Sequence, residues 1–181
     1  ITVGVIDDGI DPNHREFVGR VSPSSIDIVG NRDQLTSDET HGSSVASIIA
    51  SNYNNSQTVG LAFDATILAI RADNADGTFN ESNLAAALDY ARLHGAKVVN
   101  LSLGSQSGTS QALINAVDRA TAAGIVLVFS AGNEGQDGAT QADYPGFLAT
   151  NPSVSHGLIM IAGGLNSTGT VNPSSNPPGA A

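Results

Sequence analysis

Short, almost continuous apolar runs alternate along the chain with longer segments whose apolar residues recur every three or four positions. The continuous runs are typical of buried strands, and the recurring pattern is typical of amphipathic helices. Strands and helices that alternate in this way predict an α/β fold, with a mostly parallel sheet and helices on both of its faces. We expect strands over residues 2–6, 25–29, 65–72, 97–103, 125–130 and 158–162.

Three segments have the helical pattern, and two of them also have clear end signals. His41–Ala50 is built mainly of small and apolar residues, which would let a helix lie close to a sheet. Two further helices are expected around residues 84–91 and 113–120, and Gly95 and Gly124 follow them as C-terminal caps. The sequence shows neither an internal repeat nor a linker, so we expect a single domain over residues 1–181.

Candidate catalytic side chains follow the predicted strands. His41 opens a helix, whose N-terminal partial positive charge disfavours an imidazolium, so a basic histidine at this place needs a carboxylate partner. Asp7 ends the first strand, and Asn133 follows a later one. Open α/β sheets bind ligands at the carboxyl ends of their strands. The three side chains therefore indicate a hydrolytic site with an aspartate, a histidine and an amide.

Charge and composition narrow the classes of function. Seven basic residues against seventeen acidic ones give a net charge of −10 and an isoelectric point near 4.4. Such a field disfavours nucleic acid and anionic membranes as partners. The absence of cysteine excludes disulfides, a thiolate nucleophile and zinc–thiolate sites within these 181 residues. The longest apolar runs, such as residues 125–129, are too short to cross a bilayer.

Four segments in sequence order resemble the subtilisin-like serine proteases, or subtilases. They correspond to the aspartate, histidine, substrate-binding and oxyanion-asparagine segments of that family. The resemblance runs from about residue 2 to residue 164 and implies a subtilisin-like three-layer α/β sandwich. It also implies a serine-type endopeptidase that acts through an acyl-enzyme on extended polypeptides, in an extracellular or periplasmic location. The segments are Val3-Gly4-Val5-Ile6-Asp7-Asp8-Gly9, His41-Gly42-Ser43-Ser44-Val45-Ala46, Asn100-Leu101-Ser102-Leu103-Gly104 and Ala131-Gly132-Asn133-Glu134-Gly135.

The resemblance implies a role for each matching residue. Asp7 would fix the tautomer of His41, and His41 would act first as general base and then as general acid. The side-chain amide of Asn133 would donate a hydrogen bond to the oxyanion. Two backbone segments would hold the substrate, one by pairing with it as an added strand and one by lining the pocket for the residue before the scissile bond. The substrate-binding residues implied in this way are Ser102, Leu103, Gly104, Ala131 and Gly132.

The nucleophile segment of the family, Gly-Thr-Ser-x-Ala-x-Pro, has no counterpart after Asn133. Residues 108–112 match its first half, but Ile114 stands in the proline position and the segment precedes Asn133, so Ser110 is interpreted as a helix N-cap. Residues 166–181 are rich in Asn, Ser, Thr, Pro and Gly and end without a strand or helix, which leads us to expect a truncated domain. The serine would lie on missing C-terminal sequence or on a second fragment, and residues 1–181 alone would be close to inactive.

Each candidate residue also has a structural interpretation. Asp7 could be an ordinary turn aspartate at a strand end. His41 could cap its helix or face solvent, and Asn133, between two glycines, could be a left-handed turn residue. Asp8 and Ser44 differ from the best-known family members, although a paired aspartate also occurs in the family.

Two other functions fit part of the sequence. A non-catalytic module could bind extended peptides beside residues 102–104, which accounts for the missing serine but leaves the aspartate, histidine and asparagine unexplained. A receiver-like or Mg²⁺-dependent phosphoryl-transfer domain could use the pair Asp7 and Asp8. It would need a further carboxylate and a lysine at the strand ends, whereas the only lysine, Lys97, begins a strand.

No metal site is predicted. His14, His94 and His156 have no neighbouring ligands at metal-binding spacing and are expected to face solvent. The segment Asn54-Asn55-Ser56 resembles the calcium loop of the family only loosely, and a loop turn is the favoured interpretation. Structural calcium occurs in the family, but the residues do not support it here.

Overall fold

The computed structural model describes residues 1–30, 40–55 and 58–177. The chain folds into two compact units, Ile1–Asn100 and Leu101–Ala181. Three parts of the predicted loops lie outside the described residues: positions 31–39 of the acidic loop before the first helix, Ser56 of the Asn54-Asn55-Ser56 segment, and the last four residues of the polar tail.

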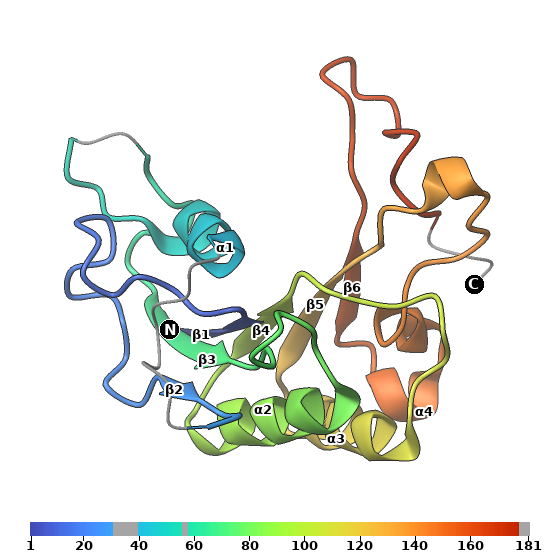
Figure 1. Ribbon diagram of the computed structural model, residues 1–181, viewed down its shortest axis with the longest axis horizontal. Coiled ribbons are helices and arrows are strands. Elements are labelled where there is room, and N and C mark those ends of the chain that lie inside the picture. Colours follow the sequence, from blue (N-terminus) through green and yellow to red (C-terminus); the bar gives the residue numbers. More distant parts are fainter. Residues whose placement is uncertain (31–39, 56–57, 178–181) are drawn as a thin grey trace. The chain divides into compact units, whose positions relative to one another are not determined.

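The first unit is built around parallel strands (Figure 1). Their order across the sheet is β2-β3-β1-β4, so that β1 lies between two neighbours. Val3 of β1 pairs with Ile67 of β3 on one side and with Val98 of β4 on the other. The strands are β1 (Thr2–Asp7), β2 (Ile26–Asp27), β3 (Thr66–Arg71) and β4 (Val98–Leu101).

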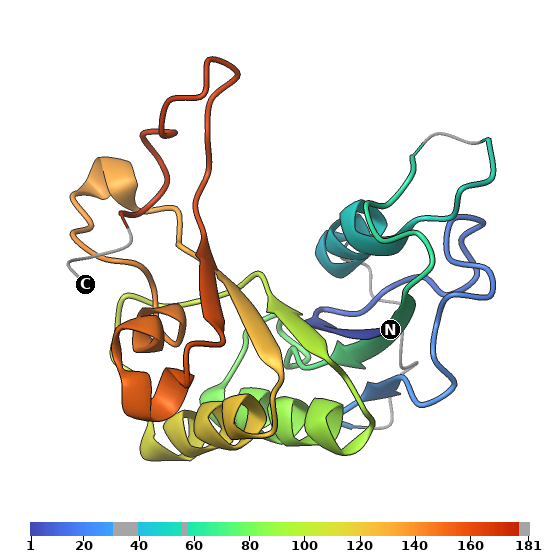
Figure 2. The same ribbon diagram turned by 180° about the vertical axis from the view of Figure 1, so that it is seen from behind.

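Successive side chains of β1 point to opposite faces of the sheet. One face packs against α1 (His41–Ala50) and the other against α2 (Glu81–Leu93). Val3 and Val5 lie in an apolar core with alanines of α1. Gly4, between them, faces the other way, and a Cβ added there would lie 3.6 Å from an alanine Cβ of α2. The two helices therefore cover opposite faces of the sheet, as the pattern predicts (Figures 1 and 2).

Small side chains let α1 approach the sheet closely. Its buried residues are Gly42, Ala46 and Ala50, which recur every four positions on one face. A Cβ on Gly42 would collide with the carbonyl oxygen of Gly9, so no larger residue fits at that position without a shift. The predicted small-residue contact is confirmed, and it places the first turn of α1 against the end of β1.

The second unit contains a parallel pair of strands, with Leu127 opposite Ile159. Its long helix buries the apolar positions that the sequence pattern predicts, including Leu113 and Val117. Within the described residues, no helix combines the length and apolar character needed to cross a membrane. The elements are α3 (Gln111–Ala122), β5 (Val126–Ser130), η1 (Gly135–Asp137), η2 (Gly146–Thr150), α4 (Pro152–Ser155) and β6 (Ile159–Ala162).

The predicted helix ends are confirmed. The hydroxyl oxygen of Ser110 accepts a hydrogen bond from the backbone N–H of Leu113 at 3.4 Å, so Ser110 is the N-cap of α3. Gly95 and Gly124 follow α2 and α3 with a left-handed φ of +80°, the conformation that a helix-terminating glycine adopts.

Two strands are shorter than predicted by three residues each, and the others agree with the prediction to within two residues. The strand expected over residues 97–103 ends at Leu101, because Ser105 pairs with Tyr144 in an antiparallel bridge and draws the intervening residues away from the sheet. The strand expected over residues 25–29 is reduced to β2, because Asp27 Oδ1 accepts a hydrogen bond from the N–H of Val29 (3.0 Å) and turns the chain.

Candidate active site

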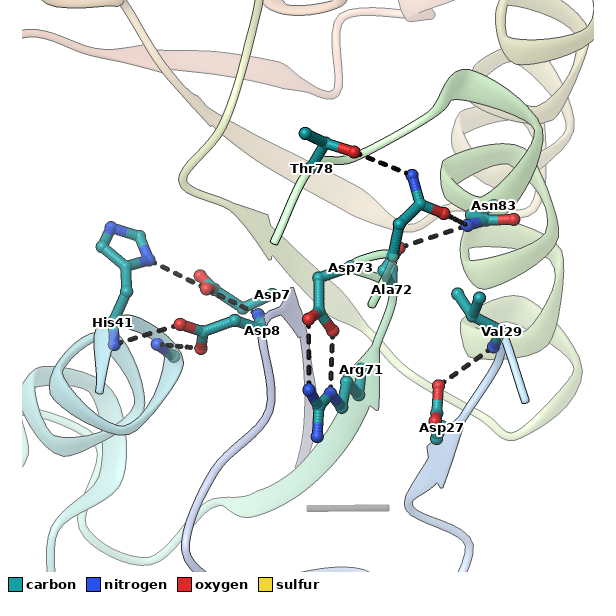
Figure 3. Close-up of polar contacts among 12 residues, drawn as sticks. Asp7, Asp8, Asp27, Val29, His41, Arg71, Ala72, Asp73, Thr78 and Asn83 are labelled. Carbon is teal, nitrogen blue, oxygen red and sulfur yellow. Dashed lines mark hydrogen bonds and ion pairs between the residues drawn. The ribbon is translucent and has the colours of Figure 1, made fainter. Parts of the chain in front are cut away.

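The end of β1 and the first turn of α1 bring Asp7 and His41 together, as Figure 3 shows. Asp7 Oδ1 lies 2.8 Å from His41 Nδ1. Asp7 is 3% exposed, whereas the His41 side chain is 57% exposed. Nε2 of His41 makes no hydrogen bond within the described part of the chain. A buried carboxylate thus holds one edge of the ring while the other edge is open to an incoming group.

Electrostatics fix the protonation pattern of this pair. An ionised carboxylate can only accept, so Nδ1 of His41 carries a proton and Nε2 keeps its lone pair when the ring is neutral. The hydrogen bond to Asp7 raises the pKa of His41, although partial burial of the ring opposes it. Burial also raises the pKa of Asp7, against the hydrogen bonds from His41 and from the Asp8 N–H. The arrangement is suited to a general base whose tautomer is fixed.

Asp8 caps α1 from outside the helix. Thr40 occupies the N-cap position, but its side chain makes no capping hydrogen bond. Instead, Asp8 Oδ1 accepts from the N–H of Gly42 at 2.7 Å, and Oδ2 accepts from the N–H of His41 at 3.3 Å. A carboxylate at this end also offsets the partial positive charge of the helix. The sequence shows the unusual aspartate but not that it caps a helix 33 residues further along the chain.

A buried ion pair lies at the same end of the sheet (Figure 3). Arg71 is opposite Asp7 in the β1–β3 register. Its Nε and Nη2 atoms donate to the two carboxylate oxygens of Asp73 at 2.8 and 3.1 Å. Because Asp7 contacts His41, Asp8 caps α1 and Asp73 pairs with arginine, none of these carboxylates is poised as a Mg²⁺ ligand, which disfavours the phosphoryl-transfer interpretation.

Asn133 belongs to the second unit and is exposed. Its backbone N–H donates to Glu134 Oε2 at 2.8 Å, and its side-chain amide makes no hydrogen bond with any described residue. The left-handed backbone of this turn is that of Gly132, with φ +102°, whereas the φ of Asn133 is not positive. The interpretation of Asn133 as a left-handed turn residue is therefore wrong, and its amide remains available as a donor.

All the predicted substrate-binding residues, 102–104 and 131–132, also lie in the second unit. Residues 102–104 follow β4 as irregular chain, and neither Leu103 nor Gly104 makes a backbone hydrogen bond within the described residues. Gly104 and Gly132 pack against one side chain, that of Asp143: added Cβ atoms would lie 2.6 Å from its Cβ and 2.7 Å from its Cγ, respectively. The structure thus brings the two segments together at a residue that the sequence analysis missed.

The remaining histidines are exposed, as predicted. His94 Nδ1 lies 2.9 Å from the carbonyl oxygen of Tyr90, and His156 Nε2 lies 2.8 Å from Asp118 Oδ1. Asn55 has a left-handed φ of +58°, which agrees with a loop turn. Among residues 1–30, 40–55 and 58–177, no three histidine or acidic side chains are grouped so that they could hold a metal ion.

Comparisons with known proteins identify the family and the fold of this chain. The subtilase family matches residues 1–177. Subtilisin DY from Bacillus licheniformis is 36% identical over 76% of this chain and 49% of its own length. A thermophilic serine proteinase from Bacillus sp. (strain AK1) is 40% identical over 74% of this chain and 33% of its own. The crystal structure of a cold adapted subtilisin-like serine proteinase has a TM-score of 0.76 and 27% identity, covering 97% of this chain and 58% of that one.

These likenesses confirm the predicted fold, an α/β, subtilisin-like three-layer arrangement with a mostly parallel sheet. The chain spans half or less of the length of the two curated relatives. The activity of a whole protein, its substrates and its partners are therefore inferred below from the site.

We expect the Asp7→Asn substitution to lower the pKa of His41, because it removes the charged acceptor that raises this pKa above 6.5 in the native chain. NMR titration of the imidazole carbons in residues 1–181 measures the shift. Asp118→Asn, which alters the partner of His156 only, is the matched control and should leave the His41 titration in place. An unchanged pKa for His41 in the Asp7→Asn chain would contradict the pairing.

Asp8→Ala should lower the free energy of unfolding by about 1–3 kcal/mol, because two backbone N–H groups of α1 lose a buried carboxylate acceptor. Asp8→Asn keeps one side-chain oxygen and should lose less. Urea unfolding followed by circular dichroism compares the three chains. Equal stability of the alanine variant and the native chain would show that Asp8 does not cap α1.

Proposed function

This chain belongs to the subtilase family, and we propose that it supplies part of the active site of a serine-type endopeptidase. The proposal rests on the 2.8 Å contact between Asp7 Oδ1 and His41 Nδ1, with the opposite ring nitrogen exposed. Neither of the two structural interpretations of these residues accounts for a buried carboxylate aimed at an exposed imidazole.

In the proposed reaction, His41 Nε2 takes the proton of a serine hydroxyl as the serine oxygen attacks the scissile carbonyl carbon. Asp7 holds the ring in position and stabilises the imidazolium that forms. The imidazolium then gives its proton to the leaving amine, which releases the first product and leaves an acyl-enzyme. Water, deprotonated by the same nitrogen, hydrolyses the acyl-enzyme and restores the serine. The raised pKa of His41 means that the base is available only above that pKa.

In this proposal, the side-chain amide of Asn133 donates a hydrogen bond to the oxyanion of the tetrahedral intermediates. Its exposed side-chain amide, without a hydrogen bond to any described residue, and its match to the asparagine segment of the family support this role. A donor of this kind in subtilisin contributes about 3 kcal/mol to transition-state stabilisation.

The substrate is proposed to be an extended polypeptide. The backbone of residues 102–104 would pair with it as an added strand, and the unpaired backbone groups of Leu103 and Gly104 support this assignment. Ala131 and Gly132 would line the pocket for the residue before the scissile bond. A non-catalytic peptide-binding module would use the same backbone but would leave the Asp7–His41 pair without a purpose.

The nucleophile is proposed to lie outside residues 1–181, on a continuation of the chain or on a second polypeptide. Ser110, the one serine in a partly matching motif, caps α3 through its hydroxyl oxygen. Residues 1–181 alone would then be nearly inactive, because the covalent route lacks its attacking group. An extracellular or periplasmic location is proposed from the subtilisin relatives.

Intact-mass spectrometry under denaturing conditions, after reaction with a fluorophosphonate probe for serine hydrolases, tests this proposal. We expect an unlabelled 18.3 kDa species, with the probe on polypeptide outside residues 1–181 in any preparation that has peptidase activity. Ser110→Ala is the matched variant and should not change the labelling. Labelling of Ser110, or peptidase activity of the 18.3 kDa chain that survives His41→Ala, would contradict the proposal.

A further inference from the structure

We propose that Asp143 makes the protease selective for a basic residue, arginine or lysine, immediately before the scissile bond. This inference rests on the proposed function, because it uses the assignment of residues 102–104 and 131–132 to the substrate. All the residues that carry it, from Gly104 to Asn176, lie in the second unit.

The Asp143 carboxylate lies between the two substrate-binding segments. Its Oδ2 atom would be 3.1 Å from a Cβ added to Gly104 and 2.7 Å from a Cβ added to Gly132. A side chain at Gly104 would collide first with the Cβ of Asp143, and one at Gly132 would collide with the Asn176 amide and the Asp143 carboxylate. A substrate side chain held by these two segments would end beside this oxygen.

The two oxygens of this carboxylate differ in their contacts. Oδ1 accepts hydrogen bonds from Gln106 Nε2 and from Asn176 Nδ2, the latter at 3.1 Å. Within the described residues, no group donates to Oδ2 and no cationic side chain pairs with it. Asp143 is nevertheless only 5% exposed. Oδ2 therefore keeps its capacity to accept, and a guanidinium or ammonium group would supply a charge-assisted hydrogen bond to it.

The surroundings of Asp143 are acidic. Asn176 Nδ2 bridges Asp143 Oδ1 and Glu134 Oε2, the second contact being 2.9 Å, which brings two carboxylates to one amide. Burial, and then the charge of Glu134, raise the pKa of Asp143. The only lysine or arginine in residues 101–181 is Arg119, on α3. Two neighbouring carboxylates favour a cationic ligand and disfavour an acidic one.

Asp143 also has a structural role that the test must separate from selectivity. Its partner Asn176 accepts from the Glu134 N–H at 2.7 Å and donates its own N–H to the carbonyl oxygen of Gly132 at 3.2 Å, which fixes the segment near residue 176. An asparagine at position 143 retains the Oδ1 acceptor for both of its donors. Asp143→Asn therefore removes the charge while keeping this network.

Calorimetric binding of three tetrapeptide amides to residues 1–181 tests the inference. The peptides differ only in the last residue, which is arginine, its neutral analogue citrulline, or leucine. We expect the arginine peptide to bind at least about tenfold more tightly than the citrulline peptide, the size expected of a hydrogen bond between charged groups. Asp143→Asn should abolish this ratio without weakening the citrulline peptide, and Asp118→Asn, a control that removes a carboxylate on α3 outside this network, should retain the preference.

The possible outcomes separate the inference from the function on which it rests. Equal binding of the arginine and citrulline peptides to the native chain would overturn the inference and leave peptide binding intact. A ratio that persists in Asp143→Asn would also overturn it. Failure of all three peptides to bind would refute the proposed substrate segments, and the selectivity with them. Should the Asp143→Asn chain not fold, the comparison on the native chain still decides.

Discussion

Two consecutive carboxylates at the end of β1 hold the first turn of α1, and the geometry of the candidate active site follows from that constraint. Asp8 accepts hydrogen bonds from the backbone of this turn, and Asp7 from the imidazole that projects from it. Gly42 allows the approach, because any side chain there would collide with β1 and its following turn. The position of His41 is therefore fixed at both backbone and ring, while its second nitrogen stays exposed.

This constraint also resolves an electrostatic conflict. The start of a helix carries partial positive charge, which disfavours a protonated histidine. Asp8 offsets this charge at the backbone, and the hydrogen bond to Asp7 is the largest influence on the His41 pKa, which it raises. Burial makes the ionised form of Asp7 less favourable and so raises the pKa of its carboxyl group. Perturbed pKa values cluster at functional sites, and both members of this pair have one.

The parts of the fold that depend on local pattern could be predicted from the sequence. The small-residue helix His41–Ala50, the glycine ends of α2 and α3, and the N-cap at Ser110 all follow from signals within a few residues. The catalytic candidates were found because their segments resemble a family in the right order. What could not be predicted depends on contacts between distant segments. Neither the capping of α1 by Asp8 nor the position of Asp143 between two glycines leaves a local signal.

The proposed role of His41 requires that Asp7 fix its ring in the tautomer that leaves Nε2 free to accept a proton. The most direct test is the ¹⁵N chemical shifts of the His41 ring in residues 1–181, measured above its pKa. We expect a protonated Nδ1, hydrogen-bonded to Asp7, and an unprotonated Nε2. A neutral ring protonated at Nε2 would rule out this role, because Asp7 would then not orient the base and the proposed proton transfer from serine would have no acceptor.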